Sequence, residues 1–120
     1  MDRPGNKLIG RRRLYLCTPL VANFESFLEN VIRGGVDMVQ LRDKSLSDKE
    51  LIATAQVAKK VCKGFNVPFI INDRPDIALY VDADGVHIGQ DDIPASLCRK
   101  ILGTKKIVGL STHASEFKFD

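Results

Sequence analysis

The chain has 120 residues, of which 44% are hydrophobic and 28% are charged, and its formal net charge is +3. This length fits one domain around a single core, and the composition is that of an ordinary globular protein. No apolar run approaches the roughly 18 residues that a membrane-spanning helix needs, so we expect no membrane partner.

The first twelve residues form a basic leader. Much of the positive charge lies in Arg11, Arg12 and Arg13, where the leader meets the folded part. No aromatic side chains lie between these arginines to stack on bases, so we expect no nucleic-acid partner. No apolar signal-peptide core follows, which predicts a cytoplasmic protein. We interpret residues 1–12 as a flexible leader and residues 13–120 as part of one folded domain.

The first half of the folded part alternates strands and helices. A strand is predicted at residues 14–18 and another at 36–41. Between them, apolar side chains recur at helical spacing until Gly34, a typical helix stop. These side chains are Phe24, Phe27, Leu28, Val31 and Ile32. A second helix begins at a Ser-x-x-Glu capping box, Ser47 and Glu50, and ends near Gly64. Its apolar stripe is Leu51, Ala55, Ala58 and Cys62.

The second half repeats this alternation. Strands are predicted at residues 68–71, 85–88 and 107–111. A short helix begins near Pro75, and a longer one covers residues 94–102. Strands that alternate with helices indicate parallel βαβ units, either in an open doubly wound sheet or in a closed barrel. The turn after the first strand contains none of the glycines that a doubly wound sheet usually places there. We therefore predict an α/β fold, a partial TIM (β/α)8 barrel of about five βα units, with a further helix beginning near residue 120.

The three cysteines, Cys17, Cys62 and Cys98, are far apart, and none belongs to a Cys-x-x-Cys pair. Each lies among apolar neighbours, which predicts buried, reduced thiols.

Polar residues cluster where the predicted strands end, which is the edge that carries the active site in βα barrels. The second strand leads into Gln40, Arg42 and Lys44. A planar guanidinium followed by an ammonium suits an anion with several oxygens, such as a diphosphate. The alternative to diphosphate binding is that Arg42 and Lys44 are loop side chains that contact only solvent.

Carboxylates follow the next two strands, Asp73 after the third and Asp92 after the fourth. Each can ligate a hard cation or cap the helix that follows it. Two acidic strand ends beside a basic one predict a Mg²⁺–diphosphate site, since magnesium often binds through carboxylates and substrate phosphates. Ser111 offers a hydroxyl at the same rim. His87 and His113 have no carboxylate or thiol at a recognisable spacing in the sequence, and we assign neither a chemical role.

Four segments, in order and at similar spacing, resemble the successive motifs of the thiamine phosphate synthase family. They are VQLRDK at 39–44, IINDR at 70–74, DGVHIGQDDIP at 84–94 and GLSTH at 109–113. The resemblance implies a TIM-barrel transferase of thiamine biosynthesis with a Mg²⁺ cofactor. Such an enzyme joins hydroxymethylpyrimidine diphosphate to thiazole phosphate and releases pyrophosphate.

The resemblance also implies roles for individual residues. Gln40, Arg42, Lys44, Asn72 and Ser111 match positions that bind the pyrimidine diphosphate. Of these, Arg42 and Lys44 would also act in catalysis, by stabilising charge on the departing pyrophosphate. The implied magnesium ligands are Asp73 and Asp92. No protein nucleophile is needed, which agrees with the absence of a recognisable Ser–His or Cys–His pair.

The length departs from the family pattern, because a complete barrel takes at least about 200 residues and eight strands. We expect this chain to hold the pyrimidine-diphosphate and Mg²⁺ half of the site without the thiazole phosphate site. The alternatives are a truncated, non-catalytic Mg²⁺–diphosphate binding or assembly module, a thiazole tautomerase-like protein, and a fragment with no activity. The intact pyrimidine-diphosphate motifs argue against the tautomerase.

Truncation also predicts exposed surfaces. The first and fifth strands would be sheet edges, and the barrel interior would be open to water. We therefore expect a homo-oligomer or a pairing with a complementary half-barrel.

Overall fold

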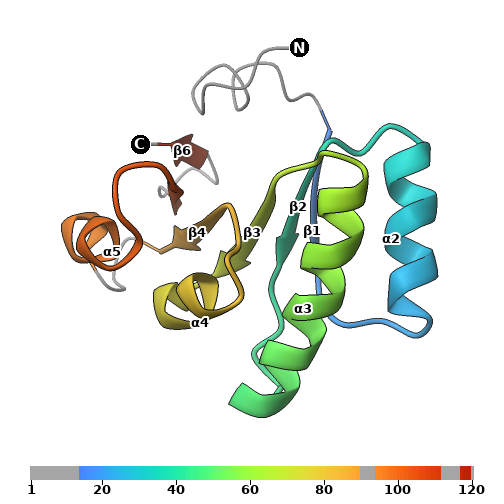
Figure 1. Ribbon diagram of the computed structural model, residues 1–120, viewed down its shortest axis with the longest axis horizontal. Helices are drawn as coiled ribbons and strands as arrows, with labels where there is room; N and C mark the ends of the chain where they lie inside the picture. The colour runs from blue at the N-terminus through green and yellow to red at the C-terminus, as the bar shows by residue number, and fades with distance from the viewer. Residues whose placement is uncertain (1–13, 90–93, 112–116, 120) are drawn as a thin grey trace.

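The computed structural model describes residues 14–89, 94–111 and 117–119 (Figure 1). The elements in chain order are β1 Tyr15–Thr18, α2 Phe24–Arg33, β2 Met38–Leu41, α3 Asp48–Gly64, β3 Phe69–Asn72, α4 Pro75–Tyr80, β4 Gly85–Ile88, α5 Ala95–Leu102, β5 Ile107–Ser111 and β6 Phe117–Phe119. The strands and helices predicted within residues 14–111 are all present, with boundaries that differ by up to two residues. None of the described helices is long and apolar enough to cross a membrane.

The strands form one sheet in the order β1-β2-β3-β4-β5-β6. The first five are parallel, which confirms the α/β class. Their order follows the chain without the reversal that defines a doubly wound sheet. Helix α3 contacts β2 and β3, α4 contacts β3 and β4, and α5 contacts β4 and β5 (Figure 1). The sheet is open across the described residues, as expected because five strands cannot close an eight-stranded barrel, and the partial TIM barrel stays a prediction.

The C-terminal strand β6 corrects the expectation of a fifth helix. It pairs antiparallel with β5, with Gly109 opposite Phe119 and Ser111 opposite Phe117. The Phe-Lys-Phe sequence has the aromatic content typical of strands, and pairing satisfies main-chain groups that an open β5 would leave unpaired. The prediction that the fifth strand is an edge is therefore wrong, and the edges are β1 and β6.

The main core lies between the sheet and its helices. The apolar stripes predicted from helical spacing face it, with Leu28 and Ala55 fully buried. From the sheet, alternate residues such as Val39, Phe69 and Val86 pack against these stripes. Burial of this surface is the main favourable contribution to folding.

The opposite face of the sheet carries a smaller apolar cluster of Met38, Ile70 and Ile107, against which Tyr15 packs. All three aliphatic side chains are buried. The expectation that this face is open to water is therefore wrong for these positions. The phenol ring of Tyr15, from the edge strand, covers apolar surface that would otherwise be exposed.

Two of the three cysteines behave as predicted, because Cys62 and Cys98 are buried free thiols. Burial raises the pKa of Cys62 to about 12. The prediction is wrong for Cys17, which is a free but exposed thiol. Cys17 lies on β1, and an edge strand has a covering neighbour on one side only.

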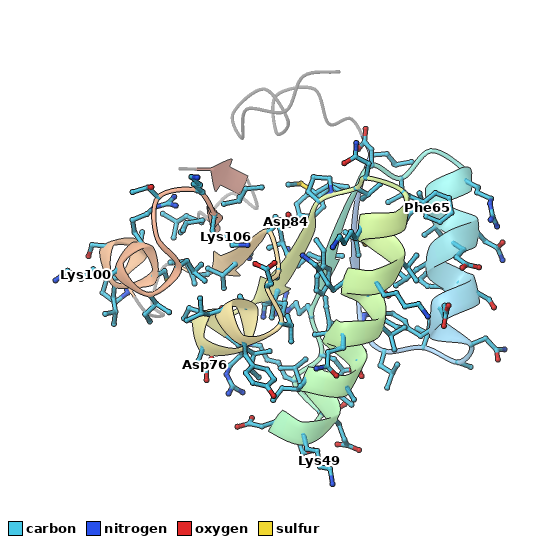
Figure 2. The ribbon with its side chains drawn as sticks, in the orientation of Figure 1. Lys49, Phe65, Asp76, Asp84, Lys100 and Lys106 are labelled. Atoms are coloured by element: carbon cyan, nitrogen blue, oxygen red, sulfur yellow. The ribbon has the colours of Figure 1, made fainter. Side chains whose placement is uncertain are left out.

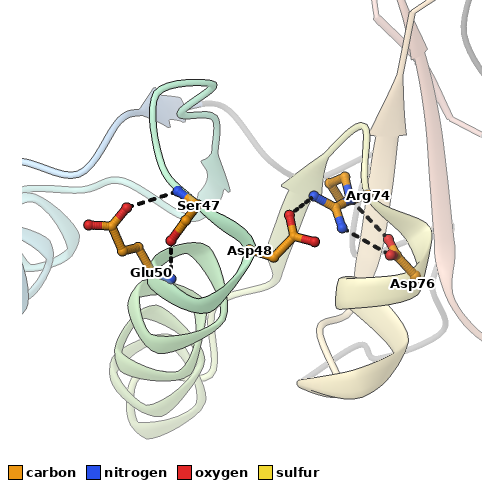
Figure 3. A network of polar contacts seen from close by, with 5 residues as sticks. All are labelled: Ser47, Asp48, Glu50, Arg74 and Asp76. Atoms are coloured by element: carbon orange, nitrogen blue, oxygen red, sulfur yellow. Dashed lines mark hydrogen bonds and ion pairs between the residues drawn. The ribbon is translucent and has the colours of Figure 1, made fainter.

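The capping box at the start of α3 is confirmed. Ser47 Oγ accepts a hydrogen bond from Glu50 N at 3.2 Å, and Glu50 Oε1 accepts one from Ser47 N at 2.8 Å (Figure 3). These bonds satisfy main-chain donors that a helix start leaves unpaired. They also fix the point at which the loop after β2 enters the helix.

We expect Ser47→Ala to lower the free energy of unfolding by about 1 kcal/mol, because the helix loses this cap. Urea unfolding followed by circular dichroism measures the difference. Ser96→Ala, at an exposed position in the first turn of α5, is the matched control and should change stability little. Equal stability of both variants would show that the capping box contributes nothing.

Candidate functional site

Polar residues at the ends of β2 and β3 surround a cavity of about 250 Å³. The parallel strands end together, and Arg42 N donates to Thr18 O at 2.9 Å while Asp73 N donates to His87 O at 2.7 Å. The cavity is lined by Leu41, Asp43, Lys44, Leu46, Leu51, Asn72, Asp73 and Arg74. Three predicted site residues, Lys44, Asn72 and Asp73, therefore meet at one place.

Asp73 has the most unusual environment in this group. Its Oδ2 accepts a hydrogen bond from Asn72 Nδ2 at 3.1 Å and lies 3.3 Å from Lys44 Nζ. Its Oδ1 is buried and has no hydrogen-bond partner among the described residues. Its φ of 61° is in the left-handed region, which is uncommon for residues other than glycine. A strained residue with an unpaired carboxylate oxygen points to a functional role.

The capping alternative for Asp73 is not what the structure shows. The N-cap of α4 is Arg74, and no side chain makes a capping hydrogen bond there. Asp73 instead directs its carboxylate toward Lys44 and the cavity. A hard cation such as Mg²⁺ prefers carboxylate oxygens, so the unpartnered Oδ1 fits a role as a metal ligand. No group of three or more His, Cys, Asp or Glu side chains placed to bind a metal occurs among the described residues.

Lys44 extends from a loop that Asp43 holds in shape. Asp43 Oδ1 accepts a hydrogen bond from Ser45 N at 2.9 Å, and Oδ2 accepts one from Leu20 N at 3.1 Å. The Ser45 hydroxyl bond, the largest contribution, lowers the pKa of Asp43. The side chain of Lys44 is 67% exposed, so it can reach a ligand without breaking packing. The sequence analysis missed Asp43, although Asp-x-Ser is a pattern that favours such a turn.

Gln40 and Arg42 lie apart from the cavity lining. Gln40 is buried, and its Nε2 donates a hydrogen bond to the hydroxyl of Tyr15. Burial raises the pKa of Tyr15 to about 12, so the phenol stays neutral at neutral pH. Arg42 is exposed, and strand alternation directs it to the same side as Gln40. Tyr15, which the sequence analysis did not identify, holds the amide of Gln40 in place.

His87 lies beside Asn72 because their strands are paired in register. The imidazole is buried, and its Nδ1 is 3.5 Å from Asn72 Oδ1. It thus lies next to a predicted substrate-binding residue. A lone strand histidine gives no such signal in the sequence, because the pairing of β3 with β4 is a tertiary feature.

Two of the predicted site residues cannot be placed with the others. Asp92 lies outside the described residues. His113, to which no role was assigned, lies outside them too. Ser111 ends β5, and its backbone pairs with Phe117, but its side chain is outside the described part. The shared site for Asp73 and Asp92 therefore stays a prediction.

A larger cavity of about 520 Å³ lies at the opposite ends of the strands, where Lys106 and Asp84 are found (Figure 2). Its carboxylates are engaged in holding the fold. Asp84 Oδ2 accepts a hydrogen bond from Phe69 N at 2.7 Å, and Asp82 Oδ1 accepts one from Lys106 at 2.6 Å. The N-terminal ends of barrel strands serve stability rather than chemistry. The smaller cavity beside Asp73 is therefore the candidate site.

The chain is similar to proteins of one family over nearly its whole described length. The family model described as thiamine monophosphate synthase matches residues 14–117. The thiamine-phosphate synthase of Campylobacter jejuni (strain RM1221) is 53% identical over 93 residues, which are 78% of this chain and 44% of that protein. The thiamine-phosphate synthase of Persephonella marina is 46% identical over 110 residues, 92% of this chain and 48% of that protein.

A solved structure gives the same picture. The thiamine phosphate pyrophosphorylase from Pyrococcus furiosus superposes with a TM-score of 0.75 at 26% identity, covering 84% of this chain and 50% of that one. The chain thus spans less than half the length of the two curated relatives above and half of the solved one.

Proposed function

Because the chain belongs to the thiamine monophosphate synthase family, we propose that its candidate site binds the diphosphate of a hydroxymethylpyrimidine diphosphate together with Mg²⁺. In this proposal the site forms the pyrimidine half of an enzyme of thiamine biosynthesis. The other substrate is a thiazole phosphate, and the products are thiamine phosphate and pyrophosphate.

The observation that carries the proposal is the environment of Asp73. A buried carboxylate oxygen without a partner destabilises a protein, and such a group is retained when a ligand completes it. Here the carboxylate of Asp73 lines a cavity of about 250 Å³, and its other oxygen, Oδ2, lies 3.3 Å from Lys44 Nζ. A carboxylate next to an ammonium at the end of a parallel strand suits a magnesium diphosphate.

In this proposal Asp73 and Asp92 hold Mg²⁺, which when bound neutralises part of the diphosphate charge. Arg42 and Lys44 bind the diphosphate oxygens and stabilise the charge that grows as the leaving group departs. Gln40, oriented by Tyr15, binds the pyrimidine together with Asn72 and Ser111. Each of these residues binds or orients, and none forms a bond to substrate.

The proposed reaction moves two electron pairs. The bond between the pyrimidine methylene carbon and the diphosphate oxygen breaks, and its electrons leave with pyrophosphate. The lone pair of the thiazole nitrogen then forms a bond to that carbon, whose positive charge the pyrimidine ring stabilises. No proton transfer to a protein base is required, which suits a site that lacks a nucleophile–base pair.

Lys44 has to exchange partners in this scheme, because its ammonium pairs with Asp73 in the absence of ligand. Lys44→Met should therefore have opposite effects on two kinds of binding. The affinity for Mg²⁺ alone should rise, by about threefold, because a competing positive charge is removed. The affinity for pyrophosphate with Mg²⁺ should fall about tenfold, because a phosphate contact is lost.

Isothermal titration of the unmodified chain and Lys44→Met measures both constants. Lys60→Met, on an exposed part of α3, is the control for loss of one positive charge. If the unmodified chain binds no pyrophosphate at any Mg²⁺ concentration, the proposed function is wrong. Changes of the same sign for both ligands would contradict only the exchange of partners by Lys44.

We also propose that the five parallel strands belong to a barrel and that the chain assembles, either with itself or with a complementary half-barrel. The sequential strand order supports the barrel. The assembly is supported by β1, which is an edge, and by the exposed Leu14 beside it. An edge strand offers main-chain donors and acceptors to another chain.

Sedimentation of the 120-residue chain should therefore show a mass that increases with concentration. The other edge, β6, has only three residues, and a short edge strand offers little pairing, so we expect a small assembly rather than open-ended growth. A single monomeric species over a hundredfold range of concentration would contradict the assembly.

A further inference from the structure

Arg74 connects the two loops that carry Lys44 and Asp73. It follows Asp73 directly, and its side chain reaches from the start of α4 to the start of α3 (Figure 3). Arg74 NH1 donates to Asp48 Oδ1 at 2.7 Å. Its Nε and NH2 donate to the two oxygens of Asp76, at 3.2 and 3.0 Å. One guanidinium thus joins the first turns of two helices.

The charges around Arg74 argue against a direct contact with a diphosphate. Its guanidinium donates to one oxygen of Asp48 and to both oxygens of Asp76. The hydrogen bonds to Asp48 and to Asp76 raise the pKa of Arg74 further above its ordinary value. Two carboxylates surround one guanidinium, so the group as a whole is negative. A diphosphate would be repelled by this group unless Arg74 left its partners. Arg74 lines the cavity, yet its donors point away toward the carboxylates.

The network is also a weak source of stability. Asp48 and Asp76 are 72% and 64% exposed, and exposed ion pairs typically contribute little to stability. What the network does determine is geometry. Helix α3 begins at Asp48, directly after the loop of Lys44, and α4 begins at Pro75, two residues after Asp73. The bridge sets how far apart these two loop ends lie.

We propose that Arg74 is a positioning residue, which holds Lys44 and Asp73 at the separation that a magnesium diphosphate requires. The proposal rests on the proposed function of the site. Arg74 acts through Asp48 and the capped start of α3 on one side, and through its neighbour Asp73 on the other. Residues that orient metal ligands typically change affinity by about 10- to 100-fold when they are replaced.

The decisive variant is Asp48→Asn, because the two explanations predict opposite signs. If Arg74 bound the ligand directly, loss of the Asp48 charge would free the guanidinium and strengthen binding. Positioning predicts instead that pyrophosphate binding in the presence of Mg²⁺ weakens about tenfold. Asp48→Glu, which keeps the carboxylate, should restore affinity to within about threefold of the unmodified chain, since a charge-assisted bond is regained.

Arg74→Gln should weaken binding by the same factor as Asp48→Asn. The double variant should bind pyrophosphate no more weakly than either single variant. Both changes remove the same bridge, so their losses of binding free energy should not add. Lys49→Gln, an exposed neighbour in the first turn of α3 (Figure 2), is the control for the loss of a positive charge, with an expected change below about twofold.

Titration of pyrophosphate at saturating Mg²⁺ measures all five variants, and urea unfolding measures their stability. We expect the urea midpoints of the variants to stay close to that of the unmodified chain, because exposed ion pairs contribute little to stability. Unchanged or tighter binding by Asp48→Asn would overturn the positioning role while leaving the proposed function intact. Additive losses in the double variant would overturn it as well. If the unmodified chain itself binds no pyrophosphate, it is the proposed function that is wrong.

Discussion

Asp73→Asn is expected to abolish Mg²⁺-dependent binding of pyrophosphate, with a loss of about 100-fold or more, because the metal loses a charged ligand. The same variant should fold as well as the unmodified chain, or slightly better. Asp73 Oδ1 is buried without a partner among the described residues, and an unpaired buried acceptor costs about 1 to 3 kcal/mol. Asparagine tolerates the left-handed backbone at this position, where φ is 61°.

The combination of lost binding and preserved stability distinguishes a functional residue from a structural one. Titration of Mg²⁺ at fixed pyrophosphate measures the first property, and urea unfolding measures the second. Glu25→Gln, an exposed acidic position in the first turn of α2, is the control for the loss of one negative charge. Binding by Asp73→Asn as strong as that of the unmodified chain would show that Asp73 is not a metal ligand.

Asp92→Asn extends this test to the part of the site that lies outside the described residues. If the two aspartates share one cation, both variants should lose the same Mg²⁺-dependent part of the binding. The part that does not depend on Mg²⁺, through Arg42 and Lys44, should persist in both. If Asp73→Asn loses Mg²⁺-dependent binding and Asp92→Asn does not, then Asp73 is a metal ligand and Asp92 is not.

Features that depend on neighbours in sequence could be predicted well. The capping box of Ser47 and Glu50 and the apolar stripe of α3 arise from contacts three or four residues apart. The strand ends were predictable for a similar reason, since a buried apolar run such as Phe69–Ile71 stops where polar residues begin. Lys44 and Asp73 could be assigned to one site because parallel strands end at a common edge.

Features that depend on distant pairing could not be predicted. Tyr15 and Gln40 are 25 residues apart, and Arg74 and Asp48 are 26 apart. Neither contact follows from local spacing. Strand β6 depends on the pairing that the open edge of β5 allows. That Asp73 does not cap α4 also needed the structure, because a cap and a metal ligand both favour aspartate at a strand end.

Gly85 shows how packing between strands supports the site. It pairs with Ile70 on one side and with Ile107 on the other. Two residues farther along the same strands, Asn72 pairs with His87. The spacing of β3, β4 and β5 at Gly85 therefore also affects the positions of these two polar side chains.

Gly85→Ala should destabilise the chain by about 3 kcal/mol or more, the upper end of the range for overpacked cores. A Cβ at this position would lie 2.1 Å from the carbonyl oxygen of Ile107 and 2.6 Å from its Cβ. The oxygen belongs to the main chain of β5, so it cannot rotate away as a flexible side chain could. Strands β4 and β5 would have to separate, at the expense of the hydrogen bonds between them.

Gly64→Ala is the matched control, since nothing lies within 4 Å of the position that its Cβ would occupy. This residue ends α3, where alanine should be neutral or stabilising by up to about 1 kcal/mol. Urea unfolding of both variants measures the contrast. Because the clash moves β4 as a whole, Gly85→Ala should also weaken Mg²⁺–pyrophosphate binding in the fraction that stays folded. Equal stability of the two variants would mean that β5 can shift away from β4 without loss of pairing.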